Sequence, residues 1–317
     1  MEGLVTDIGG TNARIAIAEG LELKTIKVYP TRQFQGAIEL FQQFQADIGR
    51  PLPKRWAVGA AGVTSPERIH GTNIGWDIVR DELVSTFGLE LCILLNDFEI
   101  AAYGLATLGG DQLVELGGAS AKPSAPRIIL GAGTGLGEAT CVICPGSKWH
   151  VLKSEGGHAS LAPTDETEIK LLKFLQQRFG HVSYERVLSG QGILSLYEFF
   201  LAESGQKESA RTFDDPSQVT KAALEGEPLS LKAIELFCRI YGEEAGNFAL
   251  KTLPFGGVFL SGGIVLHILP ILQKGLFRKG FESKGRMKEI LRNIPVFVVK
   301  EPYLGLYGGA YRLLQES

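Results

Sequence analysis

The hydrophobic pattern of the chain opens with a strand, a glycine turn and a second strand. Apolar residues dominate 4–8, Gly9 and Gly10 interrupt the run, and 14–19 alternate between apolar and other residues as a half-buried strand does. A third strand is expected at 23–29, followed by an amphipathic helix at 34–48 that ends at Gly49. The pattern therefore predicts a meander followed by a helix.

The next elements lead to a second polar junction. Short strands are expected at 56–59 and 68–71, and Asp77 is a candidate N-cap for a helix at 78–87 closed by Gly88. The continuous apolar run 91–95 predicts a strand that is covered on both faces. It ends at Asn96 and Asp97, and a helix at 98–108 follows directly.

The second half of the chain repeats the opening pattern. Residues 109–126 are rich in Gly, Ala, Ser and Pro and mark the expected domain boundary. A strand at 127–130, a glycine turn at 131–137 and a strand at 138–144 then form a second strand–turn–strand unit. Such an internal repeat predicts two glycine turns, one in each half, that can face each other.

The remaining elements include a third strand-to-glycine junction at 257–264 that leads into a helix. A strand at 149–153, a helix at 164–179 and a long helix near 229–252 precede it, and a strand at 295–299 and a helix at 308–315 follow it. The glycine-rich stretch 305–309 is interpreted as a hinge through which the closing helix returns to the first domain.

Composition narrows the class of protein. The chain has 317 residues, which suggests about two domains, and its net charge of −3 gives no reason to expect a nucleic acid or a membrane surface as partner. No apolar run approaches the roughly 18 residues that span a bilayer, and the N-terminus lacks a basic region. We therefore expect a cytoplasmic globular protein with a small-molecule partner.

The four cysteines predict neither a disulfide framework nor a metal site. Cys141 and Cys144 have metal-like spacing, but in a strand residues three apart point to opposite faces, and no second Cys or Cys/His pair accompanies them. Packing within the strand is the better interpretation. No structural zinc is expected.

The glycine turns suggest a nucleotide, but neither common glycine loop fits. A Walker P-loop requires Gly-Lys, which the chain lacks, and a Rossmann fingerprint requires a helix after the glycines, whereas the turn at 131–137 leads into a strand. A hairpin turn can hold an anion through its backbone amides, and a carboxylate such as Asp7 can hold hydrated Mg²⁺. An ordinary hairpin turn is the alternative interpretation of each motif taken alone.

Several motifs in order resemble the bacterial ATP-dependent glucokinases of the actin-like sugar kinase superfamily. They occupy 7–12, 95–98, 131–137, 155–158, 185–190 and 261–264, so the resemblance covers nearly the whole chain. It implies a two-domain α/β fold of the actin-like, or ribonuclease H-like, type with a cleft between the domains. Residues 1–109 with about 300–317 would form the small domain, and 110–299 the large one.

The resemblance also implies which residues bind sugar and perform the chemistry. Asp97 would be the general base; its end-of-strand position suits that role, although a helix N-cap is the alternative. Alone, Glu185 could be an exposed helix charge and His158 an ordinary loop histidine. The full set expected to hold sugar hydroxyls is Asn73, Asn96, Asp97, Glu155, His158 and Glu185.

A second implied set would hold ATP and Mg²⁺. Asp7 would reach Mg²⁺ through water, Gly262 and Gly263 would lie near the adenosine, and Arg14 could face the phosphates or be a strand-surface charge. The expected phosphate-binding residues are Asp7, Gly9, Gly10, Thr11, Asn12, Gly133, Thr134 and Gly135.

The resulting hypothesis is ATP-dependent phosphorylation of glucose on its 6-hydroxyl, an entry step of glycolysis, by a homodimer. Two alternatives stay open at this point. One is a kinase for another hexose, such as mannose, fructose or an amino sugar. The other is an actin-like ATPase without a sugar acceptor.

Overall fold

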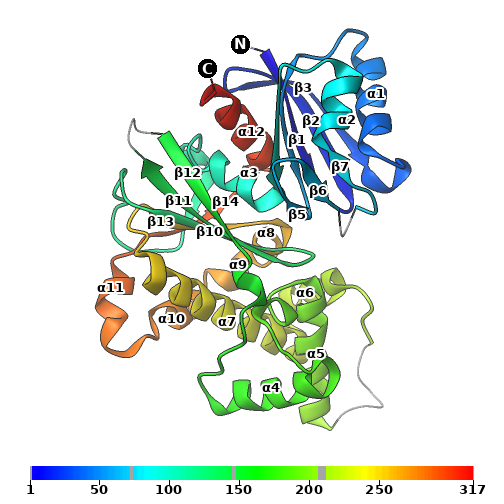
Figure 1. The fold of residues 1–317 in the computed structure, drawn as a ribbon. Helices are drawn as coiled ribbons and strands as arrows, with labels where there is room; N and C mark the ends of the chain where they lie inside the picture. Colours follow the sequence, from blue (N-terminus) through cyan, green and yellow to red (C-terminus); the bar gives the residue numbers. More distant parts are fainter. Residues whose placement is uncertain (1, 72–73, 145–147, 206–211, 317) are drawn as a thin grey trace. The chain divides into compact units, whose positions relative to one another are not determined.

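The computed structural model describes residues 2–71, 74–144, 148–205 and 212–316 (Figure 1). The chain divides into two compact units. Met1–Gly110, Cys141–Lys153 and Glu301–Ser317 form unit 1, and Asp111–Thr140 and Ser154–Lys300 form unit 2. The segment Cys141–Lys153 belongs to unit 1, whereas the sequence predicts it to lie in the large domain.

Unit 1 is built on a five-stranded sheet in the order β3-β2-β1-β4-β8. The first three strands form the expected antiparallel meander, whereas β1, β4 and β8 run parallel. The strands are β1 (Glu2–Ile8), β2 (Asn12–Glu19), β3 (Glu22–Pro30), β4 (Arg55–Ala60) and β8 (Leu91–Asn96), and a small antiparallel sheet holds β5 (Val63–Thr64), β6 (Arg68–His70) and β7 (Ile78–Val79).

Helices cover both faces of the unit 1 sheet. On one face Leu4 and Ile8 pack with Phe41 and Phe44 of α1, and on the other Val5 packs with Leu306 of α12, as the alternation of side chains along a strand requires. The helices of this unit are α1 (Ala37–Ile48), α2 (Arg80–Phe87), α3 (Asp97–Gly104) and α12 (Leu304–Leu314), with the 3₁₀ turn η1 (Thr31–Gln33) after β3. The 3₁₀ turn η2 (Gly110–Gln112) spans the boundary at Gly110 between the two units.

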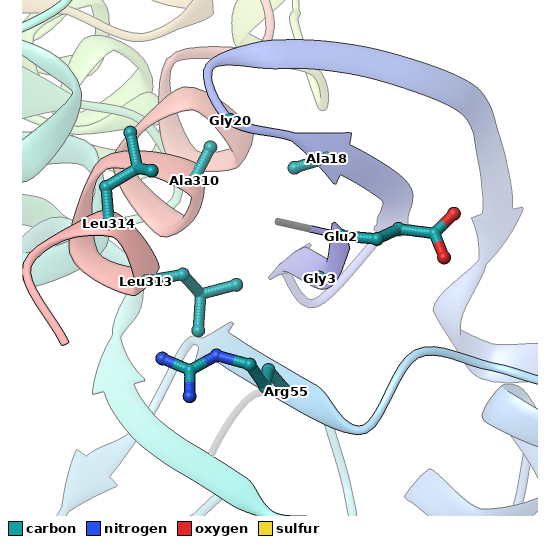
Figure 2. A pocket seen from close by; sticks show the side chains of 8 residues that line it. All are labelled: Glu2, Gly3, Ala18, Gly20, Arg55, Ala310, Leu313 and Leu314. Atoms are coloured by element: carbon teal, nitrogen blue, oxygen red, sulfur yellow. The ribbon is translucent and has the colours of Figure 1, made fainter. Parts of the chain in front are cut away.

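The closing helix α12 approaches the sheet closely because small residues lie beneath it. Figure 2 shows Ala310 and Leu313 beside Gly3 and Ala18, around a cavity of about 10 Å³ that has room for no more than one water. A Cβ on Gly3 would overlap the Leu313 side chain. This packing places α12 in unit 1, where the sequence expected it.

The glycines of α12 are contact points rather than the predicted hinge. A Cβ on Gly308 would overlap the carbonyl oxygen of Ile100 in α3, and a Cβ on Gly309 would lie 3.0 Å from Val5 Cβ. Both glycines are inside the helix and buried. They let α12 pack against α3 and β1, so the hinge interpretation of 305–309 is not supported.

Two further local predictions for unit 1 are wrong. Strand β8 is an edge strand whose first three residues are only half-buried, not a strand covered on both faces. Asp77 does not cap α2, which begins at Arg80 after a short strand; its Oδ1 lies 2.8 Å from His70 Nδ1 and accepts a hydrogen bond from Gly71 N. Tertiary partners compete successfully here with the local cap.

The sheet that unit 2 is built on repeats the topology of the first. It runs in the order β12-β11-β10-β13-β14-β9, with β13 parallel to both β10 and β14, so the predicted internal repeat is confirmed. The end of β11 and nearly all of β12 belong to the segment Cys141–Lys153 that is grouped with unit 1. Strand β9 at its edge was not predicted. The strands are β9 (Leu113–Glu115), β10 (Arg127–Ala132), β11 (Leu136–Cys144), β12 (Lys148–Ser154), β13 (Gly257–Ser261) and β14 (Val296–Val299).

A helical layer packs on this sheet around the long helix α7. Phe237 and Tyr241 of α7 lie in one core with Ile128 and Leu130 of β10, and the Tyr241 hydroxyl donates to Leu130 O at 3.0 Å. The helices are α4 (Glu166–Phe179), α5 (Gly190–Ser204), α6 (Pro216–Leu224), α7 (Pro228–Thr252), α8 (Gly263–His267), α9 (Leu269–Leu272), α10 (Leu276–Glu282) and α11 (Lys288–Arg292), with 3₁₀ turns η3 (Gly156–His158), η4 (Tyr184–Arg186) and η5 (Gly285–Met287). No helix within the described ranges is long and apolar enough to cross a membrane.

Candidate active site

The turn between β1 and β2 is held in shape by a buried threonine. Gly9 N donates to Asn12 O at 2.9 Å across the turn. Thr31, the first residue of η1 directly after β3, donates through its hydroxyl to Gly9 O at 2.7 Å and through its amide to Thr11 O at 3.0 Å. Both bonds use carbonyl groups of the turn, so Thr31 fixes the backbone without using the turn's amides.

Asp7 lies beside this turn, opposite Arg14 on the neighbouring strand. Arg14 Nη1 is 3.3 Å from Asp7 Oδ2, so Arg14 pairs with Asp7 rather than serving as a free surface charge. Burial raises the pKa of Asp7, and the Arg14 guanidinium opposes that rise. Gly305 of α12 closes the other side, since a Cβ there would lie 3.0 Å from Asp7 Cγ.

Asn96 is the residue that caps α3. Its Oδ1 accepts a hydrogen bond from Phe98 N at 2.8 Å, and Glu99 returns a capping-box contact to Asn96 N. Asn96 Nδ2 donates to Gly62 O at 3.0 Å. The side chain of Asn96 also favours the ionised form of Asp97 through a hydrogen bond, which leaves one oxygen lone pair of Asn96 for another partner.

Asp97, the first residue of α3, is therefore not needed as the cap. Burial, together with the nearby Asp7 carboxylate, raises the pKa of Asp97 to about 6, while a hydrogen bond from Phe98 N opposes the rise. Asp7 and Asp97 stand at the carboxyl ends of β1 and β8, which run in the same direction, so both lie at one edge of the sheet. A carboxylate with a pKa near 6 is ionised at pH 7 yet basic enough to accept a proton.

The matching turn of unit 2 is joined to Glu185. Gly133 N donates to Gly135 O at 2.8 Å, and Gly190 N donates to Gly133 O at 2.9 Å. Glu185 Oε2 accepts a hydrogen bond from Leu136 N at 2.9 Å, and a Cβ on Gly135 would overlap that oxygen. The glycine at 135 is thus required by the approach of Glu185, and Thr134 at the tip of the turn is exposed.

Three predicted sugar-binding side chains come together in unit 2. His158 Nδ1 is 3.9 Å from Glu185 Oε1, and its Nε2 is 3.9 Å from Glu155 Oε2, so the ring lies between two carboxylates. The side chains of Glu155, His158 and Glu185 are 81%, 61% and 29% exposed, which leaves their polar atoms open to a ligand. The group combines hydrogen-bond acceptors with a ring that both donates and accepts, as a set of sugar hydroxyls requires.

The glycines of the predicted nucleotide site fall into two kinds. Gly262, at the end of β13, has φ of 98°, and a Cβ there would lie 2.8 Å from Ala132 O, so the backbone itself requires glycine. A Cβ on Gly133 or Gly263 would meet nothing within 4 Å, and on Gly9 only Asn12 O at 3.5 Å. The fold does not explain glycine at these three positions, whereas close approach of a ligand would.

One predicted site residue is not described by the structure, and two residues that shape the site were not predicted. Asn73 lies outside the described residues. Among the described residues, no group of three or more His, Cys, Asp or Glu side chains is placed to hold a metal ion. Sequence reasoning missed Thr31 and Gly305; the only available signals were a threonine after an apolar strand and a glycine inside a helical pattern.

Comparison with known proteins shows that the chain is similar to glucokinases. A family model described as Glucokinase matches residues 4–316. The glucokinase of Hahella chejuensis is 38% identical over 317 residues, covering 99% of this chain and 97% of that protein.

Solved structures show the same likeness. A glucokinase from an Antarctic psychrotroph has a TM-score of 0.88 at 31% identity and covers 99% of both chains. A ROK family glucokinase from Streptomyces griseus, in complex with glucose and AMPPNP, has a TM-score of 0.71 at 18% identity and covers 100% of both chains. The likeness confirms the predicted actin-like sugar kinase fold.

Proposed function

The chain belongs to the glucokinase family, and we propose that it transfers the γ-phosphate of ATP to the 6-hydroxyl of glucose with Asp97 as general base. The observation that carries the residue assignment is the Asp97 carboxyl, which is spared from helix capping by Asn96 and has its pKa raised to about 6. The neighbouring Asp7 lies at the same edge of the sheet.

Glucose binding uses the group Glu155, His158 and Glu185. Each sugar hydroxyl can donate one hydrogen bond and accept others, so the two carboxylates accept from hydroxyls while the imidazole complements them. Asn96 adds its remaining oxygen lone pair. The polar set favours a sugar acceptor over an ATPase without one, because ATP hydrolysis alone requires no hydroxyl-binding group.

The chemical step moves one proton and one phosphoryl group. As the sugar O6 forms its bond to the γ-phosphorus, the proton of that hydroxyl passes to the Asp97 carboxylate. The bond between the γ-phosphorus and the β,γ-bridging oxygen breaks, and ADP leaves with that oxygen. Asp97 then returns its proton to water, which restores the base.

The glycine turns provide the phosphate contacts in this proposal. Backbone amides of 10–12 and 134–135 are the donors, with the hydroxyls of Thr11 and Thr134, because the amides of Gly9 and Gly133 are already bonded within their own turns. The open space at Gly133 and Gly263 fits the close approach of a nucleotide. The Streptomyces griseus glucokinase, which shares the fold, was solved with the ATP analogue AMPPNP. That complex supports ATP as donor.

Mg²⁺ fits the donor set near the first turn. Mg²⁺ keeps several waters and commonly takes one or two protein carboxylates, and the partly buried Asp7 offers one, whose ionised form is favoured by the nearby Arg14 guanidinium against the effect of burial. When bound with ATP, the ion neutralises charge that develops on the phosphates.

ATP turnover measured with and without glucose tests the function. We expect ADP release to be slow with ATP alone and to rise strongly on addition of glucose. A panel of mannose, fructose and glucosamine separates glucose from the other hexoses. Turnover that no sugar stimulates would refute the kinase function and favour an actin-like ATPase.

The same proposal includes a homodimer in the cytoplasm. The resemblance to bacterial glucokinases supports the dimer, and the reducing compartment agrees with four free cysteines in the described chain. Light scattering of the purified protein should give twice the mass of the 34.3 kDa chain. A monomer mass at micromolar concentration would contradict this part.

A further inference from the structure

The loop that carries Glu155 and His158 lies directly on a buried carboxyl group, that of Glu138. Glu138 is on β11, just after the glycine turn, and is only 3% exposed. A Cβ on Gly156 would overlap Glu138 Oε2 and lie 2.9 Å from its Cδ, so the loop backbone is packed against the carboxyl group. The same loop is fixed on its other side, where a Cβ on Gly157 would overlap Leu136 O.

At least one oxygen of this carboxyl group lacks, among the residues that the structure describes, the partner that a buried charge needs. Glu138 Oε1 has no hydrogen-bond partner among the described residues. A carboxylate buried in this way carries a desolvation cost that only a close cation or several donors can offset. The geometry therefore suits a neutral carboxylic acid.

The charges around Glu138 come from α7 and from the loop. On α7, Glu244 disfavours ionisation of Glu138 and the exposed Lys251 favours it. The Tyr241 hydroxyl also interacts electrostatically with the Glu138 carboxyl group. Burial is the largest cause of the rise in the pKa of Glu138 to about 8; Glu244 adds to the rise and Lys251 opposes it. On the loop side the titratable groups are Glu155 and His158.

We propose that Glu138 is a positioning residue for glucose binding, which acts as a neutral acid beneath Gly156 and sets the places of Glu155 and His158. When Glu138 ionises, the new charge is repelled by Glu244 and must gain water, which it reaches only by displacing the loop. Glucose binding then weakens at alkaline pH. This inference rests on the proposed role of Glu155 and His158 in holding the sugar.

The test is the pH dependence of glucose binding in wild type and Glu138→Gln. Glutamine has the shape of the neutral acid and does not ionise. Calorimetry without ATP from pH 6.5 to 9.5 should show the wild-type Kd for glucose rising above pH about 8, by up to about tenfold per pH unit. Glu138→Gln should keep its neutral-pH affinity throughout, and Glu115→Gln, which removes an exposed strand carboxylate, should follow wild type.

A second variant tests the same idea without altering Glu138. Lys251→Met removes the cation that favours ionisation, so the alkaline rise in Kd should move to higher pH. A wild-type Kd that stays flat to pH 9.5, or an alkaline rise that persists in Glu138→Gln, would overturn the proposal.

The sugar site itself needs a separate control. Glu155→Gln should weaken glucose binding at pH 7, where Glu138 is neutral in every variant that retains it. If Glu155→Gln binds glucose as wild type does, the proposed sugar site fails, whatever the behaviour of Glu138→Gln.

Discussion

Replacing Asp97 by Asn should strongly lower kcat and stabilise the fold. Burial and the Asp7 carboxylate raise the pKa of Asp97 from 3.8 to about 6. The native state therefore binds this proton more tightly than the unfolded state, and stability falls as pH rises from about 4 to 6 and stays lower above. At about 1.4 kcal/mol per pKa unit, the charged form costs on the order of 3 kcal/mol at pH 7.5.

Asparagine removes this cost and keeps the local hydrogen bonding. Its Oδ1 can accept from Phe98 N as Asp97 Oδ1 does at 3.0 Å. Because the Asp97 side chain is partly exposed, we expect a gain of about 1 to 3 kcal/mol in the free energy of unfolding at pH 7.5. The gain should be roughly half as large at pH 5, where the native carboxyl group is mostly protonated.

Urea denaturation at both pH values, with an ADP-release assay at pH 7.5, measures the two effects. Loss of the base should lower kcat by about 10² to 10⁴. Asp111→Asn, which removes an exposed carboxylate, should change neither quantity. A variant less stable than wild type at pH 7.5 would refute the raised pKa, and kcat within tenfold of wild type would refute the base assignment.

Three further predictions follow from the same contacts. In wild type, kcat/KM for glucose should fall about tenfold per pH unit below pH about 6 as Asp97 becomes protonated, which a pH–rate profile measures; a profile flat to pH 5 would contradict it. Gly308→Ala, whose Cβ would overlap a carbonyl oxygen of α3, should lower the free energy of unfolding by about 1 to 3 kcal/mol in urea, whereas a hinge glycine would change kinetics at unchanged stability. Gly135→Ala should raise the KM for glucose by displacing Glu185, and Gly133→Ala, with open space for its Cβ, should raise the KM for ATP while leaving stability unchanged; equal effects on both substrates would contradict the assignment.

Elements with a strong local signal could be predicted from the sequence. The glycine turns flanked by apolar strands appear as β1–β2 and β10–β11, and the 3.6-residue pattern before Gly49 appears as α1 with Gly49 in the left-handed conformation. These features depend on residues that are close in sequence. Their physical causes, such as the positive φ at a helix end, act locally.

The predictions that failed depend on contacts between distant segments. The apolar run of β8 looks like a central strand, but whether a strand lies at an edge depends on sheet order, which periodicity does not contain. Its half-buried residues line an open cavity of about 630 Å³ within unit 1. Likewise, the glycines of α12 resemble a hinge until the partner helix α3 is known.

The residues of the candidate site also fall into those with a signal in the sequence and those known only from their contacts. Asp7 and Asp97 stand out in the sequence because carboxylates at the ends of apolar strands are unusual. Glu155, His158 and Glu185 are expected only through the resemblance to the bacterial glucokinases. The residues that hold them in place carry no such signal. Thr31, Gly305 and Glu138 look like an ordinary turn threonine, a helix glycine and a strand carboxylate, and only their contacts show otherwise.

The two raised carboxyl pKa values have opposite consequences for a kinase that works near neutral pH. Asp97 must be ionised to accept a proton, and a pKa of about 6 leaves it ionised at pH 7 with useful basicity. Glu138 must be neutral to support the loop, and a pKa of about 8 leaves it protonated at the same pH. Burial raises both pKa values, so the pH range between about 6 and 8 is where the proposed base and the proposed loop support are both in their working forms.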